Sequence, residues 1–201
     1  MIHEITQWIP SCAVVPQERG AEFIGVIDDA DWSLGQGFHR GFCSSFHIRA
    51  GKAVWFHFPI TTPAVVNGAP MALHELMLLW QVTDGAQLYW VTAQHGGMER
   101  MELTEAGAPI ATRPEPFDVP EEMRERMAAF ERRSSVFAFP EPLKLRFGVQ
   151  LCVLIRCERA AGNVRFYGAG ARFAAVEDSS ARRVARSEFS EPDCSRGASG
   201  A

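Results

Sequence analysis

The chain has 201 residues, of which 47% are hydrophobic and 22% are charged, and its formal net charge is −4 at pH 7. A chain of this length and composition can bury one sizeable core, so we expect a single globular domain. The net negative charge provides no field that attracts a polyanion, which excludes sequence-independent binding of nucleic acid. Neither a leader-like N-terminus nor an apolar run of membrane-spanning length is visible, so the sequence predicts a cytoplasmic protein without membrane association.

The first predicted strands are residues 22–27 and 42–48, and the most informative strand follows at residues 53–63. In this third segment apolar side chains stand at successive positions, among them Trp55 and Phe56. A strand that is apolar on both faces requires cover on both. We therefore expect residues 53–63 to lie in the middle of a packed β domain.

A first β-hairpin is predicted from two apolar segments, residues 76–82 and 87–92. The four residues between them are Thr83-Asp84-Gly85-Ala86, and Asp-Gly favours a tight turn. We expect the two segments to pair with each other across this turn.

A second β-hairpin is predicted near the C-terminus, where residues 145–155 alternate between apolar and polar positions and residues 164–173 return. Residues 158–163 contain Gly-Asn and would form the connection. Gly168 and Gly170 remove side chains from one face of the returning strand. We expect either that a neighbouring aromatic ring fills this space or that the strand bends there.

One helix is predicted inside the long Pro-rich connection of residues 107–142. Asp118 and Glu121 have the spacing of a capping box, and the apolar residues between positions 123 and 130 recur at helical spacing. We expect a helix over residues 118–133. It would serve either as structural cover for one end of the domain or as a lid over a pocket.

Residues 177–201 are rich in Ser, Arg and Gly and carry few large apolar side chains. The sequence therefore predicts a folded domain at residues 1–176 followed by a disordered tail. The five cysteines lack the paired close spacing of a zinc site or a redox motif, so we expect buried, reduced thiols. Cys152 and Cys157 lie five positions apart on one predicted strand and should face opposite sides.

Histidines are the candidate acid–base groups. His57 shares a strand face with Trp55, and its simplest interpretation is a neutral core histidine. The functional alternative is a general base in a pocket walled by Trp55 and Trp90, with Glu75 as its orienting partner. His74, beside Glu75, is the second acid–base candidate. No two histidines have the spacing that places two ligands on one strand face, so we expect neither a metal nor another cofactor.

Aromatic residues are the candidate ligand-binding groups. We assign this role to Trp55, Trp90, Trp32 and Tyr167, because aromatic rings stack on sugars and on other small ligands. Trp32 lies in the acidic stretch of residues 28–35 and is the tryptophan that we least expect in regular structure.

Four segments carry a family pattern, namely residues 54–66 (VWFHFPITTPAVV), 73–80 (LHELMLLW), 147–151 (FGVQL) and 167–173 (YGAGARF). Together they resemble an uncharacterised family of small bacterial proteins, a domain of unknown function, with a similar NWFHFxIPTP strand and a terminal GAGAxF. This chain has Ile9-Pro10 where the family has His-Gly after its opening tryptophan, and Thr62 where proline is expected. The resemblance implies a single β-sandwich with no established activity.

The sequence thus predicts an all-β, two-sheet, jelly-roll-like sandwich with one helix in the connection of residues 107–142. Our first functional hypothesis is a binding or assembly module that holds a small apolar or glycan-like ligand or a protein partner, with homo-oligomers as one possible form. The alternative is a cofactor-free enzyme, a cyclase or isomerase of a hydrophobic metabolite, with His57 or the His74/Glu75 pair as acid and base.

Overall fold

The computed structural model describes residues 4–27, 37–39, 41–63, 65–95, 100–116, 118–145 and 147–176. Trp32 and residues 177–201, two subjects of the sequence predictions, lie outside the described residues. The described strands are β1 (Glu4–Pro10), β2 (Val15–Pro16), β3 (Ile24–Gly25), β4 (Phe38–His39), β5 (Ser44–Ile48), β6 (Lys52–Ile60), β7 (Val65–Val66), β8 (Ala69–His95), β9 (Arg100–Glu102), β10 (Arg113–Pro114), β11 (Arg133–Lys144) and β12 (Val149–Ala175).

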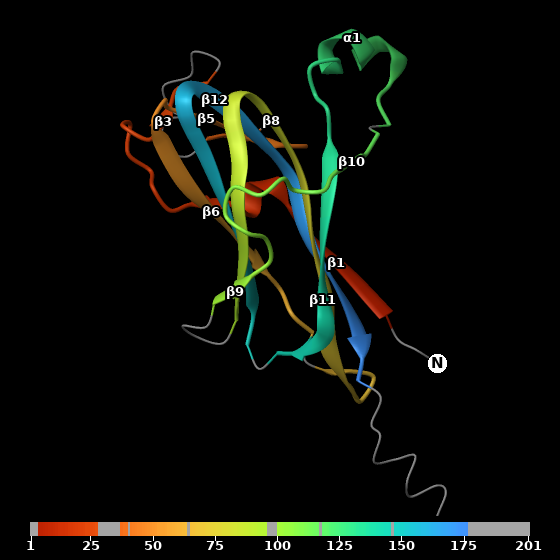
Figure 1. Cartoon of the computed structure of the whole chain (residues 1–201). Helices are drawn as coiled ribbons and strands as arrows, with labels where there is room; N and C mark the ends of the chain where they lie inside the picture. The colour runs from red at the N-terminus through yellow and green to blue at the C-terminus, as the bar shows by residue number, and fades with distance from the viewer. Residues whose placement is uncertain are drawn as a thin grey trace, which may run out of the picture.

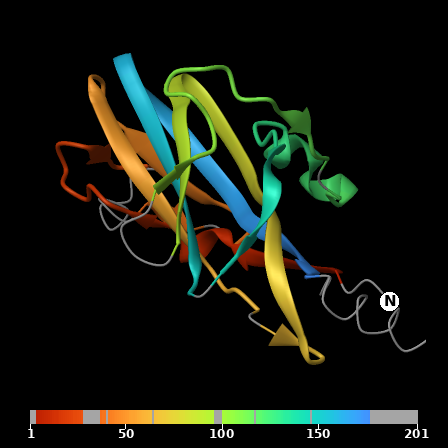
Figure 2. The same ribbon diagram turned by 60° about the horizontal axis from the view of Figure 1, so that its bottom comes forward.

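The strands form one antiparallel, 12-stranded sheet whose main order is β10-β11-β8-β12-β5-β3. Its centre is the pair β8 and β12, which run antiparallel to each other from Val149 opposite His95 to Ala175 opposite Met71. Figure 1 shows both strands bending over at the top of the view and running down again on the other side. Figure 2 shows them side by side through the molecule. The all-β architecture predicted from the sequence is confirmed.

The bend divides the sheet into two layers. The first layer contains residues 69–82 of β8 and residues 163–175 of β12, flanked by β11, β1 and β5. The second layer contains residues 86–95 of β8 and residues 149–157 of β12, flanked by β9, β6 and β2. Because the same two strands pass through both layers, the β-sandwich is one folded sheet.

Both predicted hairpins are wrong, although both predicted turns do coincide with the bend. The arms of each bent strand pair with the other long strand and not with each other. The pairing shifts register at the bend, where Cys157 faces Ala86 and Gly162 faces Asp84. A Cβ atom at Gly85 would lie 2.5 Å from the carbonyl oxygen of Ala160, and one at Gly162 would collide with the backbone nitrogen of Ala86. The glycines therefore permit a close approach of two backbones, which a single sequence cannot distinguish from a turn.

The space between the layers is filled by phenylalanine rings. Phe46 of β5 lies 4.7 Å from Phe56 of β6, measured between ring centroids, and Phe166 of β12 lies 5.0 Å from Phe56 and 5.1 Å from Phe58. All four side chains are fully buried. Contacts between rings from both layers fix how the layers stack.

Strand β6 corrects the prediction that residues 53–63 are covered on both faces. Val54, Phe56 and Phe58 are buried in the core, whereas the alternate residues Trp55 and His57 are only half buried. The edge of β6 that does not pair with β12 pairs with the two-residue strand β2. The face of β6 that carries Trp55 and His57 is partly open to solvent.

The paired glycines of β12 confirm one of the two expected solutions. A Cβ atom at Gly170 would lie 2.8 Å from the ring of Trp8, which belongs to the neighbouring strand β1. The ring thus occupies the space left by the missing side chain, while Trp8 itself remains 48% exposed. The prediction that an aromatic ring fills the space beside the glycines is therefore confirmed at Gly170, and the ring is that of Trp8 near the N-terminus.

The predicted helix of residues 118–133 is much shorter in the structure. A 3₁₀ turn at Glu121–Met123 leads into α1 (Arg124–Met127), and the residue before the turn, Pro120, provides no side-chain cap. The carbonyl oxygen of Ala129 accepts hydrogen bonds from Gln81 and Arg165 on the outer side of the first layer. These contacts join residues 118–131, which we call the cover segment, to the first layer, and both the lid and the structural cover stay predictions. Within the described residues, no helix has the length and apolar character needed to cross a membrane.

Candidate functional site

The half-buried side of β6 belongs to a larger surface on the second layer, which we call the aromatic face. Its rows run across the strands, so that Cys152 of β12 lies between His57 and Thr92, and Leu154 lies between Trp55 and Trp90. Strand β9 pairs with β8 at its edge. The aromatic face consists of Trp55, His57, Trp90, Thr92, Arg100, Cys152 and Leu154.

Two tryptophans meet at the centre of the aromatic face. The ring centroids of Trp55 and Trp90 are 5.5 Å apart, with 51° between the ring planes. The guanidinium carbon of Arg100 lies 5.4 Å from the ring centroid of Trp55 and 5.6 Å from that of Trp90, which are cation–π distances. The indole N–H of Trp90 is buried and has no hydrogen-bond partner among the described residues. The cluster therefore combines apolar rings with a charge and an unused donor.

His57 and Cys152 form a direct cross-strand pair beside the tryptophans. The Nδ1 atom of His57 lies 3.2 Å from the Sγ atom of Cys152, and its Nε2 atom lies 3.1 Å from the Oε1 atom of Gln17. Cys152 is only 4% exposed, although it stands on the outer side of β12. Imidazole, thiol and amide thus lie in one hydrogen-bonded row.

Gln17 is itself held in place by its neighbours. Its backbone nitrogen donates to the carbonyl oxygen of Trp55, which extends the pairing of β2 with β6. Its side-chain Nε2 donates to Glu18 at 2.8 Å, and the other carboxylate oxygen of Glu18 accepts from the backbone nitrogen of Trp55 at 2.9 Å. The row therefore continues from Cys152 through His57 and Gln17 to Glu18.

Burial sets the charge state of the His57–Cys152 pair. Desolvation lowers the pKa of His57, and the charge of Arg100 lowers it further, while Glu18 opposes the shift. Desolvation raises the pKa of Cys152 against the opposing effects of a hydrogen bond with Thr92 and the charge of Arg100. At neutral pH the pair is therefore a neutral imidazole beside a protonated thiol.

A shallow pocket of about 300 Å³ lies at one end of the aromatic face. Two of its lining residues, Pro59 and Gln150, lie opposite each other on β6 and β12. They are the next pair after His57 and Cys152 on the same face of these strands. The full lining is Pro59, Ile60, Thr61, Gly148, Val149 and Gln150. The pocket offers space for a small group next to the imidazole–thiol pair.

Glu75 lies on the first layer, away from His57. It belongs to a surface that we call the ionic face, which consists of Glu4, Glu75 and Arg172. Both of its carboxylate oxygens accept from Arg172, at 2.7 Å and 3.0 Å, and Arg172 also donates to Glu4 at 3.0 Å. The hydrogen bonds from Arg172 hold the pKa of Glu75 below its ordinary value. Glu75 is therefore a partner of Arg172 and not the orienting group predicted for His57. His74 occupies the adjacent irregularity of β8 and stays an untested candidate.

Tyr167 also lies on the first layer. Its hydroxyl donates to the Oε1 atom of Gln81 at 2.8 Å, and Gln81 contacts the cover segment through Ala129 and Glu131. Burial raises the pKa of Tyr167. Of the four predicted ligand-binding aromatic residues, the structure brings together Trp55 and Trp90, places Tyr167 on the other layer, and does not describe Trp32.

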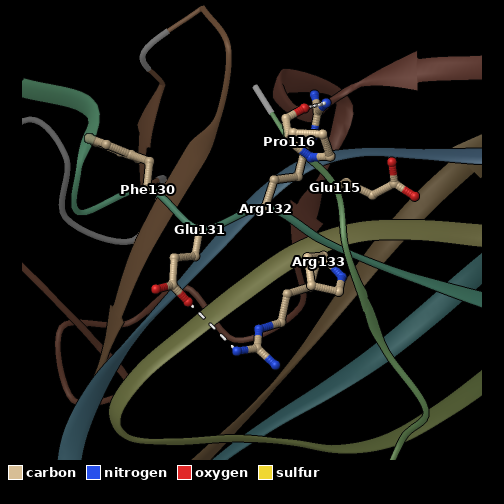
Figure 3. Close-up of a pocket in the computed structure, with 7 residues that line it drawn as sticks. Glu115, Pro116, Phe130, Glu131, Arg132 and Arg133 are labelled. Atoms are coloured by element: carbon tan, nitrogen blue, oxygen red, sulfur yellow. Dashed lines mark hydrogen bonds and ion pairs between the residues drawn. The ribbon is translucent and has the colours of Figure 1, made fainter. Parts of the chain in front are cut away.

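A second pocket, of about 380 Å³, opens between β10 and the start of β11. Figure 3 shows the side chains that surround it, with Glu131 and Arg133 joined by an ion pair of 3.6 Å. It is lined by Pro114, Glu115, Pro116, Phe130, Glu131, Arg132 and Arg133. Glu131 pairs with Arg133, Glu115 pairs with Arg113 outside the lining, and Arg132 donates to the carbonyl oxygen of Pro116, so these charged groups already have partners.

The cysteines follow the sequence prediction except at one position. Cys152 and Cys157 are buried thiols on opposite sides of β12, as expected from their odd spacing, and Cys43 is also buried. Cys194 lies outside the described residues. Cys12 is free but exposed, contrary to the prediction of buried thiols. No group of three or more His, Cys, Asp or Glu side chains that could hold a metal ion occurs within the part of the chain that the structure describes.

No protein-family model matches this sequence, and no curated protein matches it either. Among solved structures, the chain is similar to "Structure of a family two carbohydrate esterase from Cellvibrio japonicus", at 10% sequence identity and a TM-score of 0.31. The similarity covers 87% of this chain and 34% of that chain, so this chain spans about a third of that protein's length. A TM-score of this size supports no statement about function here. The lack of a family match is consistent with an uncharacterised family, and membership of the family that the sequence resembles stays a prediction.

Sequence reasoning missed three members of the candidate site, namely Cys152, Gln17 and Arg100. Cys152 was recognised only as a residue on one side of a strand, and the other two carried no motif. Alternation along residues 145–155 placed Cys152 on one strand face, but only the pairing of β12 with β6 brings it opposite His57. That pairing joins residues that are 95 positions apart, and no local pattern encodes it.

Proposed function

We propose that this protein is a binding module and that the aromatic face holds a glycan-like ligand. The observation that carries the proposal is the Trp55–Trp90 pair, which stays half buried on the outside of a sandwich whose core is already filled. Large rings left on an outer face gain burial only when something docks on them.

A glycan fits the chemistry of this face because it offers apolar C–H surfaces for rings and hydroxyls for polar groups. Arg100 and Gln94 lie opposite each other at the edge of the rings, and Gln17 and Glu18 lie beyond β6. A few polar groups around aromatic walls are the usual composition of a small-molecule site.

The test is a titration of the purified protein with a panel of oligosaccharides, followed by calorimetry and by intrinsic tryptophan fluorescence. Trp55→Ala and Trp90→Ala should each weaken the binding at least about tenfold, which corresponds to about 1.4 kcal/mol. Trp8→Ala is the matched control, because Trp8 is an exposed tryptophan on the first layer and its loss should leave the affinity unchanged. Equal losses in all three variants, or an apolar molecule co-purifying on the aromatic face in place of any sugar, would contradict the glycan assignment.

The cyclase or isomerase alternative has less support from the geometry. It requires an acid–base pair around a substrate, and Glu75 is already bound through both oxygens to Arg172. His57 is the remaining candidate base of that hypothesis for which the contacts are known. Its two nitrogens lie beside the thiol of Cys152 and the amide oxygen of Gln17. This arrangement favours a different chemistry, which we develop next.

A further inference from the structure

Cys152, His57 and Gln17 form a row of nucleophile, base and amide in which each group contacts the next. The separations are 3.2 Å from Sγ to Nδ1 and 3.1 Å from Nε2 to Oε1. A nucleophile within hydrogen-bond reach of a base, with the base held by a third group, is the arrangement of nucleophilic catalysis. We propose that Cys152 and His57 are an acyl-transfer site for small acyl esters, with Gln17 as the positioning residue.

The hydrogen bonds beyond Gln17 determine which nitrogen of His57 carries the proton. The carboxylate of Glu18 can only accept, so the amide NH₂ of Gln17 points toward it and the amide oxygen points toward His57. The Nε2 atom of His57 must then donate to that oxygen. In the neutral ring this leaves Nδ1 as an acceptor that faces the thiol of Cys152, which is the orientation that a general base requires.

The charge states support attack coupled to proton transfer. Burial lowers the pKa of His57 and raises that of Cys152, so at neutral pH the imidazole is free to accept a proton that the thiol still holds. Arg100, which lies over the rings of Trp55 and Trp90, also lowers the pKa of both groups and is the cation of this face.

The reaction balances with water as the only co-reactant. As the Cys152 sulfur bonds to the ester carbonyl carbon, its proton moves to Nδ1 of His57 and the carbonyl electron pair moves to oxygen. Return of that pair breaks the carbon–oxygen bond to the leaving alcohol, which takes the proton from His57 and leaves an S-acyl cysteine. Water then attacks the acyl carbon while His57 accepts its proton, and the released thiolate regains that proton. The products are a carboxylic acid and an alcohol.

The acyl-transfer site lies beside the surface to which we assign glycan binding, but the acyl-transfer proposal does not depend on glycan binding. The tryptophan pair lies on one side of Cys152 and the pocket of about 300 Å³ lies on the other, one residue pair away in the strand register. If the glycan assignment is correct, the ester substrates are acylated sugars that dock on Trp55 and Trp90. A minimal ester that lacks a sugar tests the thiol chemistry alone.

The experiment uses the full chain and p-nitrophenyl acetate, with p-nitrophenol release followed by absorbance and acetyl adducts located by peptide mass spectrometry. We expect acetylation at Cys152, and we expect Cys152→Ala and His57→Gln to lower the rate of p-nitrophenol release at least about 100-fold. Cys12→Ser is the matched control, because it removes an exposed thiol that is not part of the row of Cys152, His57 and Gln17 and should leave the rate unchanged. Thermal unfolding of each variant shows whether a lost rate reflects lost folding.

The positioning role of Gln17 is tested by the pH profile. In the wild-type protein the acetylation rate should rise as the pH rises through the lowered pKa of His57, because the neutral ring is the base. The charged groups that act on this ring are Glu18 and Arg100, so the profile should shift upward in Arg100→Gln. Gln17→Ala should shift the pH at which the acetylation rate rises and should lower the rate itself. If Gln17 had only a structural role, a folded variant would change neither the pH profile nor the rate.

The outcomes separate the two proposals. Acetylation at Cys12 alone, or a folded Cys152→Ala variant with an unchanged rate, would overturn the acyl-transfer site. Protection of Cys152 in the native protein together with acetylation after unfolding would overturn it as well, because a nucleophile must be accessible. Acetylation of Cys152 without any glycan binding would retain the acyl-transfer site and reject the glycan. Glycan binding without acetylation of Cys152 would do the reverse.

Discussion

The aromatic face and the ionic face lie on the outer sides of the same two strands, yet they are built differently. On the ionic face, Glu75 uses both oxygens on Arg172, which also reaches Glu4. On the aromatic face, His57 and Cys152 form a neutral pair that burial keeps uncharged. The first arrangement pairs opposite charges with each other, and the second places an uncharged imidazole beside an uncharged thiol.

This difference shows why the ion pair is a poor functional candidate although it contains an acid. The carboxylate of Glu75 is paired with Arg172 through two charge-assisted hydrogen bonds, which hold its pKa below its ordinary value. The His57–Cys152 pair differs because it carries no charge at neutral pH and its imidazole nitrogen faces a thiol.

The largest expected effect comes from breaking the bend that separates the two faces. Gly162→Val would place a side chain into the backbone of Ala86, which cannot move without opening the central strand pair. We expect a loss of about 3 kcal/mol in the free energy of unfolding, measured with urea. Gly148→Ala is the control, because a Cβ atom there meets only the carbonyl oxygen of Ile60 at 3.8 Å. Similar losses in both variants would show that the bend is not the constraint.

A smaller effect is expected from removing the ion pair of the ionic face. Arg172→Met should lower the free energy of unfolding by about 1 kcal/mol at pH 7, because the side chains of Arg172 and Glu75 are 33% and 24% exposed. Because the folded pKa of Glu75 lies below its ordinary value of 4.5, its stabilisation is present above that pH and is lost as the pH falls. The variant should therefore show a flatter loss of stability below pH 4.5, and an unchanged acid slope would contradict this role.

The aromatic face should titrate in a different and higher pH range. The folded pKa of His57 lies below its ordinary value of 6.5, so the unfolded chain binds more protons there and stability falls as the pH drops through 6.5 toward the folded pKa. We expect a smaller loss than for Glu75, because His57 holds no charged partner directly. Urea unfolding of His57→Gln at several pH values should lack this component, while Arg172→Met should retain it.

The smallest effect is expected from deleting residues 177–201, which carry few large apolar side chains. A chain that ends at Val176 should keep its free energy of unfolding within about 0.5 kcal/mol of the full chain. It should also keep the loss of stability below pH 4.5 and the acetylation of Cys152. A loss of several degrees in the melting temperature would instead indicate that Val184 or Phe189 packs on the domain.

The sequence by itself determined the fold class and the positions of five of the twelve described strands, namely β3, β5, β6, β8 and β12. It missed β11, which lies partly in the connection where only a helix was predicted. Alternation in residues 145–155 and 164–173 identified both arms of β12, and the apolar positions Phe56 and Phe58 were placed correctly in the core. These features are local, because a side chain's strand face follows from its position in a period of two. The helix in residues 107–142 was also located, although its length was overestimated.

Only the tertiary structure decided which segments pair and which face stays open. Asp-Gly and Gly-Asn indicated chain reversals, but whether the arms of a reversal pair with each other depends on strands far away in the sequence. Trp55 and His57 read as core residues, but they lie on the outer face of β6, which no other layer covers among the described residues. The contact of His57 with Cys152 follows from the register between β6 and β12, which is fixed by packing of the whole core and is written in no single segment.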